Sequence, residues 1–187
     1  MEFTFKIAST KQDFEQILAL QRQNLYTLIS QEDQEKQGFV FAEHTLELLE
    51  TLAMELPQIV AVYQGKVVGY NLAMSASMKT VLPSITPMFN AFETCIFNQK
   101  PLTDYQYLVG GQVCVDKDFR GHGLLKKLYC ETKNQVSNAY EACVTEISIR
   151  NPRSLKVHQK MGFEVIGTYH DGVEHWNIVA WDFKRSF

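Results

Sequence analysis

The first third of the chain shows two periodic patterns of hydrophobic and polar positions. Residues 3–8 alternate between apolar and polar side chains, which is typical of a strand. Apolar residues then recur at helical spacing from Phe14 to Ile29, after a capping-box-like start at Thr10. The polar segment 31–38 reads as a loop. A second helix over residues 46–56 ends at Pro57.

The middle of the chain predicts a hairpin, a long excursion and a further strand. Residues 59–63 and 67–74 are β-rich runs on either side of Gln64-Gly65-Lys66. Residues 79–104 hold three prolines and are expected to be irregular, with one short helix between Ile85 and Ile96. Residues 105–115 then return as a strand.

The last third alternates strands and helices. A helix is predicted over residues 123–139 and a strand over residues 143–149. Asn151-Pro152 is a good start for a short helix that ends at Gly162. Two β-rich runs around Asp171-Gly172 predict a hairpin over residues 163–183. This order of elements indicates one mixed α/β domain, residues 1–187, with a single central sheet.

Composition narrows the class of protein. The chain has 187 residues, of which 45% are hydrophobic and 21% charged, so a globular domain is expected rather than a disordered chain. No apolar run reaches the roughly 18 residues of a membrane helix, and no secretory signal is evident. The four cysteines form no CxxC pair, so a metal site is not expected, and they read as buried apolar residues. We therefore expect a cytoplasmic protein that does not bind membranes.

Charge is unevenly distributed along the chain. Residues 1–59 hold ten acidic and four basic residues, whereas residues 150–160 hold four basic residues and no acid. This asymmetry favours a cationic substrate and an anionic cofactor, and the alternative is a chance distribution of solvated charges. The net charge of −3 argues against a nucleic-acid partner.

The stretch from Val113 to Leu125 carries the clearest chemistry. A strand leads into a loop with Gly121 and Gly123, and a helix follows. Glycines let the backbone turn sharply, and the helix N-terminus offers N–H groups and a positive dipole end to an anion such as a phosphate. Arg120 would add a charge-assisted contact. The P-loop and GxGxxG patterns are both absent, and the alternative is an ordinary helix start.

A second motif follows 31 residues after Arg120, at Asn151. With it, the sequence resembles the GNAT superfamily of acetyl-CoA-dependent N-acetyltransferases. The superfamily's pyrophosphate loop reads [QR]-x-x-G-x-[GA], and Arg120, Gly123 and Leu125 stand at those positions, the last as a departure. The later element reads roughly N-x-x-A-x-x-h-Y-x-x-h-G-F, and here it contains Asn151, Ser154, Val157, His158, Met161, Gly162 and Phe163.

The resemblance implies a fold, a cofactor and residue roles. It implies a mostly antiparallel twisted sheet of about seven strands flanked by helices, and transfer of acetyl from acetyl-CoA to a primary amine of a small molecule or peptide. The backbone of Val113, Cys114 and Val115 would bind pantetheine, as would Asn151. His158 stands where the family often has a tyrosine that protonates the leaving thiolate. The pyrophosphate would lie on Arg120, Gly121, His122, Gly123, Leu124 and Leu125.

Several alternatives stay open. His158 is either the acid or a polar residue that lines the cofactor, and Cys114 is either a nucleophile or a buried strand residue. The base is not identifiable, with Gln112 and Tyr107 as weak candidates.

The three phenylalanines of the insert, Phe89, Phe92 and Phe97, form either core or an acceptor pocket. The rival function is a non-catalytic acyl-CoA sensor, and residues 174–183 with the insert are a possible homodimer surface.

Overall fold

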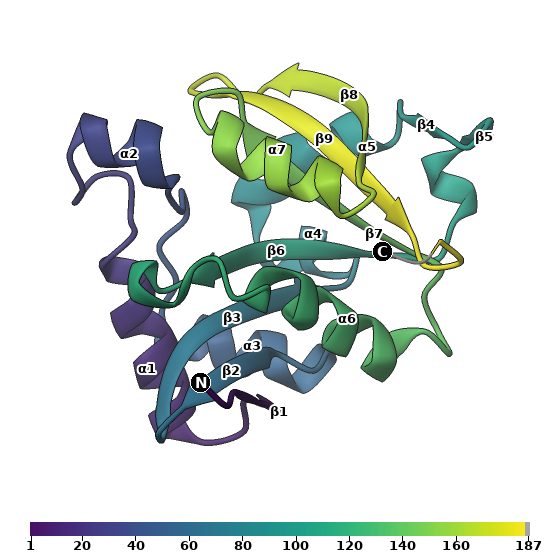
Figure 1. Ribbon diagram of the computed structural model, residues 1–187. Helices are drawn as coiled ribbons and strands as arrows, with labels where there is room; N and C mark the ends of the chain where they lie inside the picture. Colours follow the sequence, from purple (N-terminus) through teal and green to yellow (C-terminus); the bar gives the residue numbers. More distant parts are fainter. Residues whose placement is uncertain (186–187) are drawn as a thin grey trace. The chain divides into compact units, whose positions relative to one another are not determined.

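The computed structural model describes residues 1–185, which form two compact units (Figure 1). Unit 1 comprises residues 1–73 and 111–136, and unit 2 comprises residues 74–110 together with the chain from residue 137 onward. The strands are β1 (Thr4–Ile7), β2 (Ile59–Tyr63), β3 (Lys66–Met74), β4 (Ile96–Phe97), β5 (Lys100–Pro101), β6 (Tyr107–Val115), β7 (Ala142–Ser148), β8 (Glu164–His170) and β9 (His175–Asp182). The helices are α1 (Lys11–Arg22), α2 (Gln31–Gln37), α3 (Leu46–Glu55), α4 (Met78–Val81), α5 (Thr86–Phe92), α6 (Leu124–Val136) and α7 (Pro152–Lys160), with 3₁₀ turns at Pro83–Ile85, Leu102–Asp104 and Lys117–Phe119.

Within residues 1–185, seven strands are hydrogen-bonded in the order β1-β2-β3-β6-β7-β9-β8. The pairs β1–β2, β2–β3, β7–β9 and β8–β9 are antiparallel, and β6–β7 is parallel. The prediction of a mixed α/β fold with a mostly antiparallel sheet of about seven strands is thereby confirmed. Strand β6 contributes its first four residues to unit 2 and its last five to unit 1. That residues 1–187 form one domain stays a prediction, and its last two residues lie outside the described chain.

In unit 1, alternation along β6 assigns its side chains to two faces. Val113 and Val115 pack on a buried cluster that Leu124 and Leu128 of α6 form with residues of β2 and β3. Gln112 lies on the opposite face, where it accepts a hydrogen bond from Gln21 of α1 at 2.7 Å. Helices α6 and α1 therefore cover opposite faces of these strands.

The first helix is shorter than its apolar spacing predicts, because a tertiary contact replaces its last turns. The Thr10–Asp13 capping box is present, but α1 ends at Arg22. Leu25 instead forms a parallel bridge with Val40 and is buried. The polar segment predicted as a loop is the helix α2, in which no residue is buried. Without an apolar face, α2 gives no periodic signal, and its start is fixed by Ser30, which caps the Asp33 N–H.

In unit 2, helices also pack against both faces of the strands. His158 of α7 contacts Phe163, which in turn contacts Trp181 of β9, with ring centroids 5.1 and 5.8 Å apart. On the other face, the end of α5 places Cys95 so close to Gly167 of β8 that a Cβ there would lie 3.0 Å from its sulfur. The predicted hairpin of β8 and β9 is present around Asp171-Gly172.

The segment predicted to be irregular is more ordered than expected. It contains α4, α5 and the short β4–β5 pair. Its aromatic residues Phe89, Phe92 and Phe97 are at most 3% exposed, which agrees with core and not with an open pocket. Of the four cysteines, Cys130 is half-buried rather than buried, and all four are free. Across the described residues, no helix combines the length and apolar character needed to span a bilayer.

Candidate functional site

The glycine loop lies at the end of β6 in unit 1. Asp116 caps the 3₁₀ turn that follows the strand, because its side chain accepts the Asp118 N–H at 3.1 Å. Gly121 and Gly123 have φ values of 84° and 73°, which other L-residues rarely adopt. The chain therefore turns tightly from Arg120 into α6, as the sequence predicts.

The geometry of this loop fits a phosphate group. A Cβ at Gly121 or Gly123 would have no heavy atom within 4 Å, so both glycines border open space. The first bond of α6 runs from the Lys127 N–H to the Gly123 carbonyl at 3.1 Å. The N–H groups of residues 123–126 precede that bond, and such groups favour an anion together with the positive end of the helix dipole.

Arg120 is directed to protein acceptors rather than out of the loop. Its Nε donates to the Val115 carbonyl at 3.0 Å, and Nη1 donates to the Gln37 carbonyl at 2.8 Å. Its Nη2 donates to Asn24 Oδ1 at 2.8 Å. The guanidinium thus ties the end of β6 to the segments after α1 and at the end of α2. This geometry makes Arg120 a residue that positions the loop.

His122 is exposed and lies beside an aromatic cluster. Its Nδ1 donates to the carbonyls of Phe119 and Arg120, both at 3.2 Å. Its ring lies 5.7 Å from Phe3, which also contacts Tyr63 at 5.5 Å. The cluster holds the start of the chain against the loop. Leu124, next along the loop, is buried in the core, and Leu125 is half-buried.

Cys114 is a buried thiol with no acidic character. It is 5% exposed, and burial raises its pKa to about 12. A thiol that stays protonated near pH 7 is a poor nucleophile. Its environment therefore matches the alternative of a buried strand residue. Val113 and Val115 direct their side chains to the α6 core, so β6 offers a ligand only its backbone here.

Beside Cys114 lies a buried polar network that the sequence did not indicate. Gln112 Oε1 accepts from the Tyr70 hydroxyl at 2.5 Å and from Gln21 Nε2 at 2.7 Å, while Gln112 Nε2 donates to the Ala42 carbonyl at 2.8 Å. Gln21 also donates to His44 Nδ1 at 2.6 Å. Burial lowers the pKa of His44 to about 4, so its ring is neutral near pH 7.

The hydrogen bonds of Gln112 and the raised pKa of Tyr107 argue against both weak candidates for the base. The Gln112 carboxamide has no basic group, and its oxygen and nitrogen are already hydrogen-bonded. Tyr107 is half-buried, and burial raises its pKa above the usual 10. A phenol with a raised pKa stays protonated near neutral pH, so neither residue accepts a proton there.

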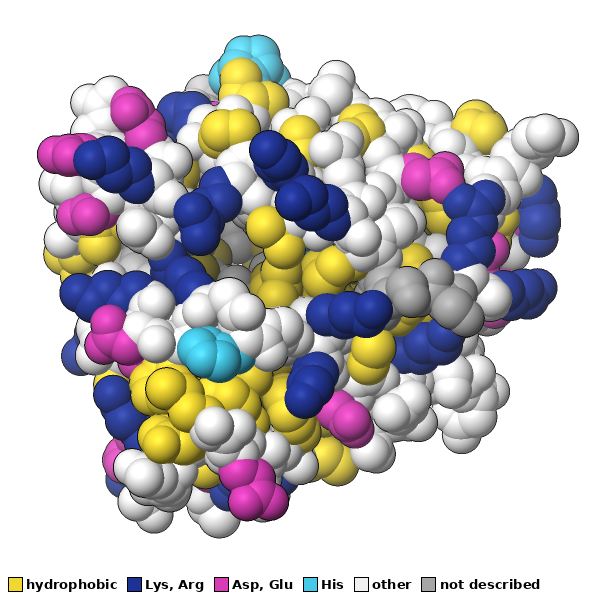
Figure 2. Space-filling view, in the orientation of Figure 1, with side chains coloured by type: hydrophobic (Ala, Val, Ile, Leu, Met, Phe, Trp, Pro, Cys, Tyr) yellow, Lys and Arg dark blue, Asp and Glu magenta, His cyan; other side chains and the backbone are white. Residues whose placement is uncertain are grey.

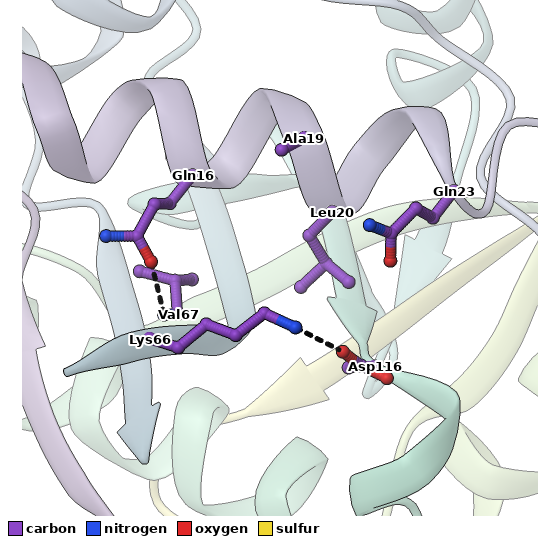
Figure 3. A pocket seen from close by; sticks show the side chains of 7 residues that line it. All are labelled: Gln16, Ala19, Leu20, Gln23, Lys66, Val67 and Asp116. Atoms are coloured by element: carbon purple, nitrogen blue, oxygen red, sulfur yellow. Dashed lines mark hydrogen bonds and ion pairs between the residues drawn. The ribbon is translucent and has the colours of Figure 1, made fainter. Parts of the chain in front are cut away.

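A small cavity lies where α1 meets the start of β3 (Figure 3). Its volume of about 50 Å³ has room for water rather than for a substrate. In it, Lys66 Nζ lies 3.7 Å from Asp116, and Gln16 Oε1 accepts the Val67 N–H at 2.7 Å. Since Asp116 caps the turn before the glycine loop, these contacts position the loop.

Asn151 and His158 belong to unit 2, where Asn151 caps the start of α7 and His158 lies on its buried face. Asn151 is buried, and its Oδ1 accepts the Ser154 N–H at 3.2 Å, which confirms the predicted helix cap. Within unit 2, the ladder between β6 and β7 covers only Tyr107–Val109 and Ala142–Val144. The remaining residues of β7, from Thr145 onward, lead toward Asn151 beyond this ladder.

His158 is neutral under ordinary conditions. It is 2% exposed, and burial lowers its pKa from 6.5 to about 4. Its Nδ1 lies 2.8 Å from the Ser154 carbonyl, which can only accept, so Nδ1 carries the proton and Nε2 has none. To act as the acid, His158 would have to be protonated far above its pKa.

The outer face of α7 is basic. Arg153, Lys156 and Lys160 are exposed, and the helix contains no acidic residue. Figure 2 shows Lys and Arg side chains gathered over this helix. This is the basic segment that the sequence identified, and its position on one exposed face would attract an anion by its summed potential.

Sequence reasoning missed Glu146 of β7. It is half-buried, and burial raises its pKa to about 7, with the Asp171 charge adding and a hydrogen bond from Tyr169 opposing. A signal was available, because a glutamate in the middle of the apolar run 142–149 is unusual. The partner Tyr169 is 23 residues away, and nothing local indicates the contact.

Comparisons with known proteins found similar structures, but no match by sequence. No protein family model matches the chain, and no curated protein matches it. The polyamine N-acetyltransferase of Drosophila melanogaster superposes with a TM-score of 0.68 at 14% identity, over 97% of this chain and all of that chain (100%).

Two further structures agree with this result. A chain of the NatC complex, solved with Gag peptide and CoA, gives a TM-score of 0.65 at 13% identity over 97% of this chain and 99% of its own. An N-acetyltransferase from Staphylococcus aureus gives a TM-score of 0.62 at 20% identity, over 98% of this chain and 99% of its own. At these identities the likeness establishes the fold.

Proposed function

From the fold of the GNAT N-acetyltransferases, which this chain adopts, we propose that the protein is an acetyl-CoA-dependent N-acetyltransferase. It would move acetyl directly to a primary amine of a small molecule or peptide. The observation that carries this proposal is the glycine loop. Gly121 and Gly123 adopt positive φ, border open space and precede α6 at the position that the superfamily uses for pyrophosphate.

The proposed contacts with acetyl-CoA are mainly backbone contacts. Amides of Gly121, His122, Gly123, Leu124 and Leu125 would bind the pyrophosphate, and Arg120 would hold this loop in shape through its hydrogen bonds to Val115, Gln37 and Asn24. The backbone of residues 113–115 in unit 1 would bind pantetheine. In unit 2, Asn151 and the end of β7 would do the same, and the basic face of α7 would attract the phosphates.

The reaction requires few groups from the protein. The acceptor amine must be neutral to attack, and the thioester oxygen must be stabilised as charge develops on it. A backbone N–H near Val115 is our candidate for that oxygen. The thiolate can take its proton from the attacking nitrogen, which becomes acidic once bonded to the acyl carbon. His158 is then needed for packing rather than for proton transfer, in line with its neutral ring.

We also propose that the acceptor is cationic. The segment 1–59 carries ten acidic against four basic residues. One structural neighbour is a polyamine N-acetyltransferase, and another was solved bound to Gag peptide and CoA. Polyamines are cations, which supports this proposal. A cytoplasmic location is a further expectation from the sequence, and residues 174–183 with the insert offer a surface that could support a homodimer.

A coupled assay tests the proposed function. The protein is mixed with acetyl-CoA and one of four amines, namely spermidine, glucosamine, a short peptide with a free α-amine, or glutamate as an acidic control. We expect CoA release with at least one cationic amine and none with glutamate. Acetylation of only acidic or neutral amines would contradict the cationic acceptor. Tight acetyl-CoA binding without turnover on any amine would favour the non-catalytic sensor.

A further inference from the structure

Four aromatic rings gather beside the glycine loop in unit 1. Phe3, just before β1, has its ring centroid 5.5 Å from that of Tyr63 at the end of β2 and 6.0 Å from that of Phe119. Tyr63 and Phe119 are 5.3 Å apart. His122, which belongs to the loop itself, lies 5.7 Å from Phe3. We call these four residues the aromatic patch.

The aromatic patch is held by the protein and is still reachable from solvent. Phe3, Tyr63 and Phe119 pack against the buried cluster that α6 forms with β2 and β3. All three are nevertheless only half-buried, and His122 is exposed. Figure 2 shows hydrophobic side chains gathered on the surface over β1 and β2. The rings therefore form a preformed surface on which the ring of a ligand can lie.

The glycine loop connects this patch to strand β6. In unit 1 the strand order is β1-β2-β3-β6, so β6 and β1 lie on opposite sides of β2 and β3. The pantetheine contact proposed above uses the backbone of residues 113–115 on β6. The patch uses Phe3 and Tyr63 from the side of β1 and β2, and His122 from the loop. A pyrophosphate on the loop amides would thus have β6 on one side and the aromatic patch on the other.

A cation borders the aromatic patch. Phe5 shares the face of Phe3, because alternate residues of a strand point the same way. The Nζ atom of Lys127 on α6 lies 5.9 Å from the centroid of the Phe5 ring, and this lysine is exposed. An apolar surface between a lysine and an anion-binding loop favours an aromatic ligand that carries negative charge over a purely apolar partner.

We propose that the aromatic patch binds the adenine of acetyl-CoA by stacking. This inference rests on the proposed acetyltransferase function and extends its cofactor site beyond the loop amides. Bases stack readily on aromatic side chains, and every base has a π-face to offer. In acetyl-CoA the pyrophosphate links pantetheine to adenosine. With pantetheine on β6 and pyrophosphate on the loop, the adenosine leaves the loop on the side of His122 and Phe3.

The patch supplies binding and takes no part in the chemistry. The adenine is remote from the thioester, so its contacts stabilise the bound cofactor and the transition state equally. Interactions of this kind lower KM for the cofactor and leave kcat unchanged. Loss of the patch should therefore weaken acetyl-CoA binding without slowing turnover at saturation.

The first test is Phe3→Leu, which removes an aromatic face but keeps an apolar side chain on the α6 cluster. Calorimetry compares acetyl-CoA with S-acetyl-4′-phosphopantetheine, which lacks the adenosine. We expect the variant to bind acetyl-CoA about tenfold more weakly than the wild type, as the loss of one base–aromatic contact implies. It should bind the truncated ligand as the wild type does.

Two further variants serve as controls. Phe39→Leu makes the same change in a second aromatic cluster of unit 1, where Phe39 is also half-buried and lies 6.2 Å from Tyr26. Phe3→Tyr keeps the aromatic ring within the patch. Both variants should bind both ligands with wild-type affinity.

The second test observes the contact in the wild type, so it does not depend on how a variant folds. Nuclear Overhauser effects are recorded between the H2 and H8 protons of adenine in bound CoA and the ring protons of labelled phenylalanine. We expect cross-peaks to Phe3 and an upfield shift of the adenine protons caused by the ring currents. In Phe3→Leu the cross-peaks should vanish and the shift should shrink.

Each outcome separates this inference from the proposed function. Equal losses of affinity for both ligands in Phe3→Leu would mean that Phe3 only supports the loop, and would overturn the adenine site. An unchanged acetyl-CoA affinity would overturn it as well, including the case in which Phe3→Leu dissociates a dimer built on this patch. Either result leaves acetyl-CoA binding intact. A wild-type protein that binds neither ligand would overturn the proposed function and, with it, this inference.

Discussion

The two units of the chain present their chemistry in different ways. In unit 1, the side chains around the glycine loop are bound to protein partners, as Arg120 and Gln112 show, so the ligand groups are backbone amides. In unit 2, Glu146 has a pKa of about 7, whereas the shifted groups of unit 1, His44 with a pKa of about 4 and Cys114 with a pKa of about 12, do not change charge near pH 7.

This difference matches two different tasks. A pyrophosphate is charged at every physiological pH, so groups that do not titrate bind it best. Proton transfer needs a group whose pKa lies near the working pH, and burial together with a neighbouring negative charge raises the pKa of a carboxylate toward that range. The comparison therefore predicts that changes in unit 1 alter binding of acetyl-CoA, whereas changes in unit 2 alter pH dependence.

The largest expected effect is the acid sensitivity caused by His158. Its pKa falls from 6.5 to about 4 on folding, so the unfolded chain binds a proton at a higher pH than the folded chain. The contribution of neutral His158 to the free energy of unfolding is fully present above pH 6.5. It is lost as the pH falls toward 4, and a shift of this size corresponds to about 3 kcal/mol. Urea unfolding of the wild type and of His158→Gln at pH 7.5 and 4.5 measures this loss.

In His158→Gln the acid loss should be smaller, while turnover at pH 7.5 stays within a few-fold because the ring is neutral there. Parallel losses in both proteins would refute the assignment. A large drop in kcat at saturating acetyl-CoA would instead restore His158 as the acid.

The next effect concerns Arg120, which we interpret as a positioning residue in unit 1. Arg120→Met removes hydrogen bonds to Val115, Gln37 and Asn24. We expect the free energy of unfolding to fall by about 2 kcal/mol, since each charge-assisted bond contributes on that order but these are partly exposed. Chemical denaturation measures the fall, and calorimetry measures acetyl-CoA affinity. An affinity loss of 100-fold without loss of stability would show that the guanidinium binds phosphate directly.

The smallest effect separates backbone strain from ligand contact. Gly123→Ala adds a methyl group at φ 73°, and Gly172→Ala adds one at φ 101° in the hairpin turn of unit 2. Neither methyl group would meet protein atoms within 4 Å, so both variants carry a similar strain of about 1–2 kcal/mol. Only Gly123→Ala should weaken acetyl-CoA binding, by about tenfold, which corresponds to about 1.4 kcal/mol. Equal affinities by calorimetry would mean that the loop is an ordinary helix start.

Local signals allowed much of this fold to be predicted. The Thr10 and Asn151 caps and the hairpin around Asp171-Gly172 each depend on residues a few positions apart, and all are present. The glycine loop was found in the same way, because positive φ and a following helix are properties of adjacent residues.

What the sequence did not predict depends on contacts between distant residues or on burial. The Gln21–Gln112 bond spans 91 positions, and Glu146–Tyr169 spans 23. Helix α2 buries no residue and therefore lacks an apolar pattern. Leu25 lies beyond the end of α1 because it forms a bridge with Val40 instead. Neutral His158 and the half-charged Glu146 follow from desolvation, which only the folded chain produces.

Thermal unfolding with and without acetyl-CoA tests the central claim most directly, with ATP and NAD as controls. At a ligand concentration 100 times its Kd, binding should stabilise the protein by about 2.7 kcal/mol. For a chain of this size the unfolding temperature should rise by roughly 5–10 °C. A rise with acetyl-CoA and none with ATP or NAD is the predicted result. No rise at high acetyl-CoA concentration would contradict the loop assignment and the acetyltransferase proposal with it.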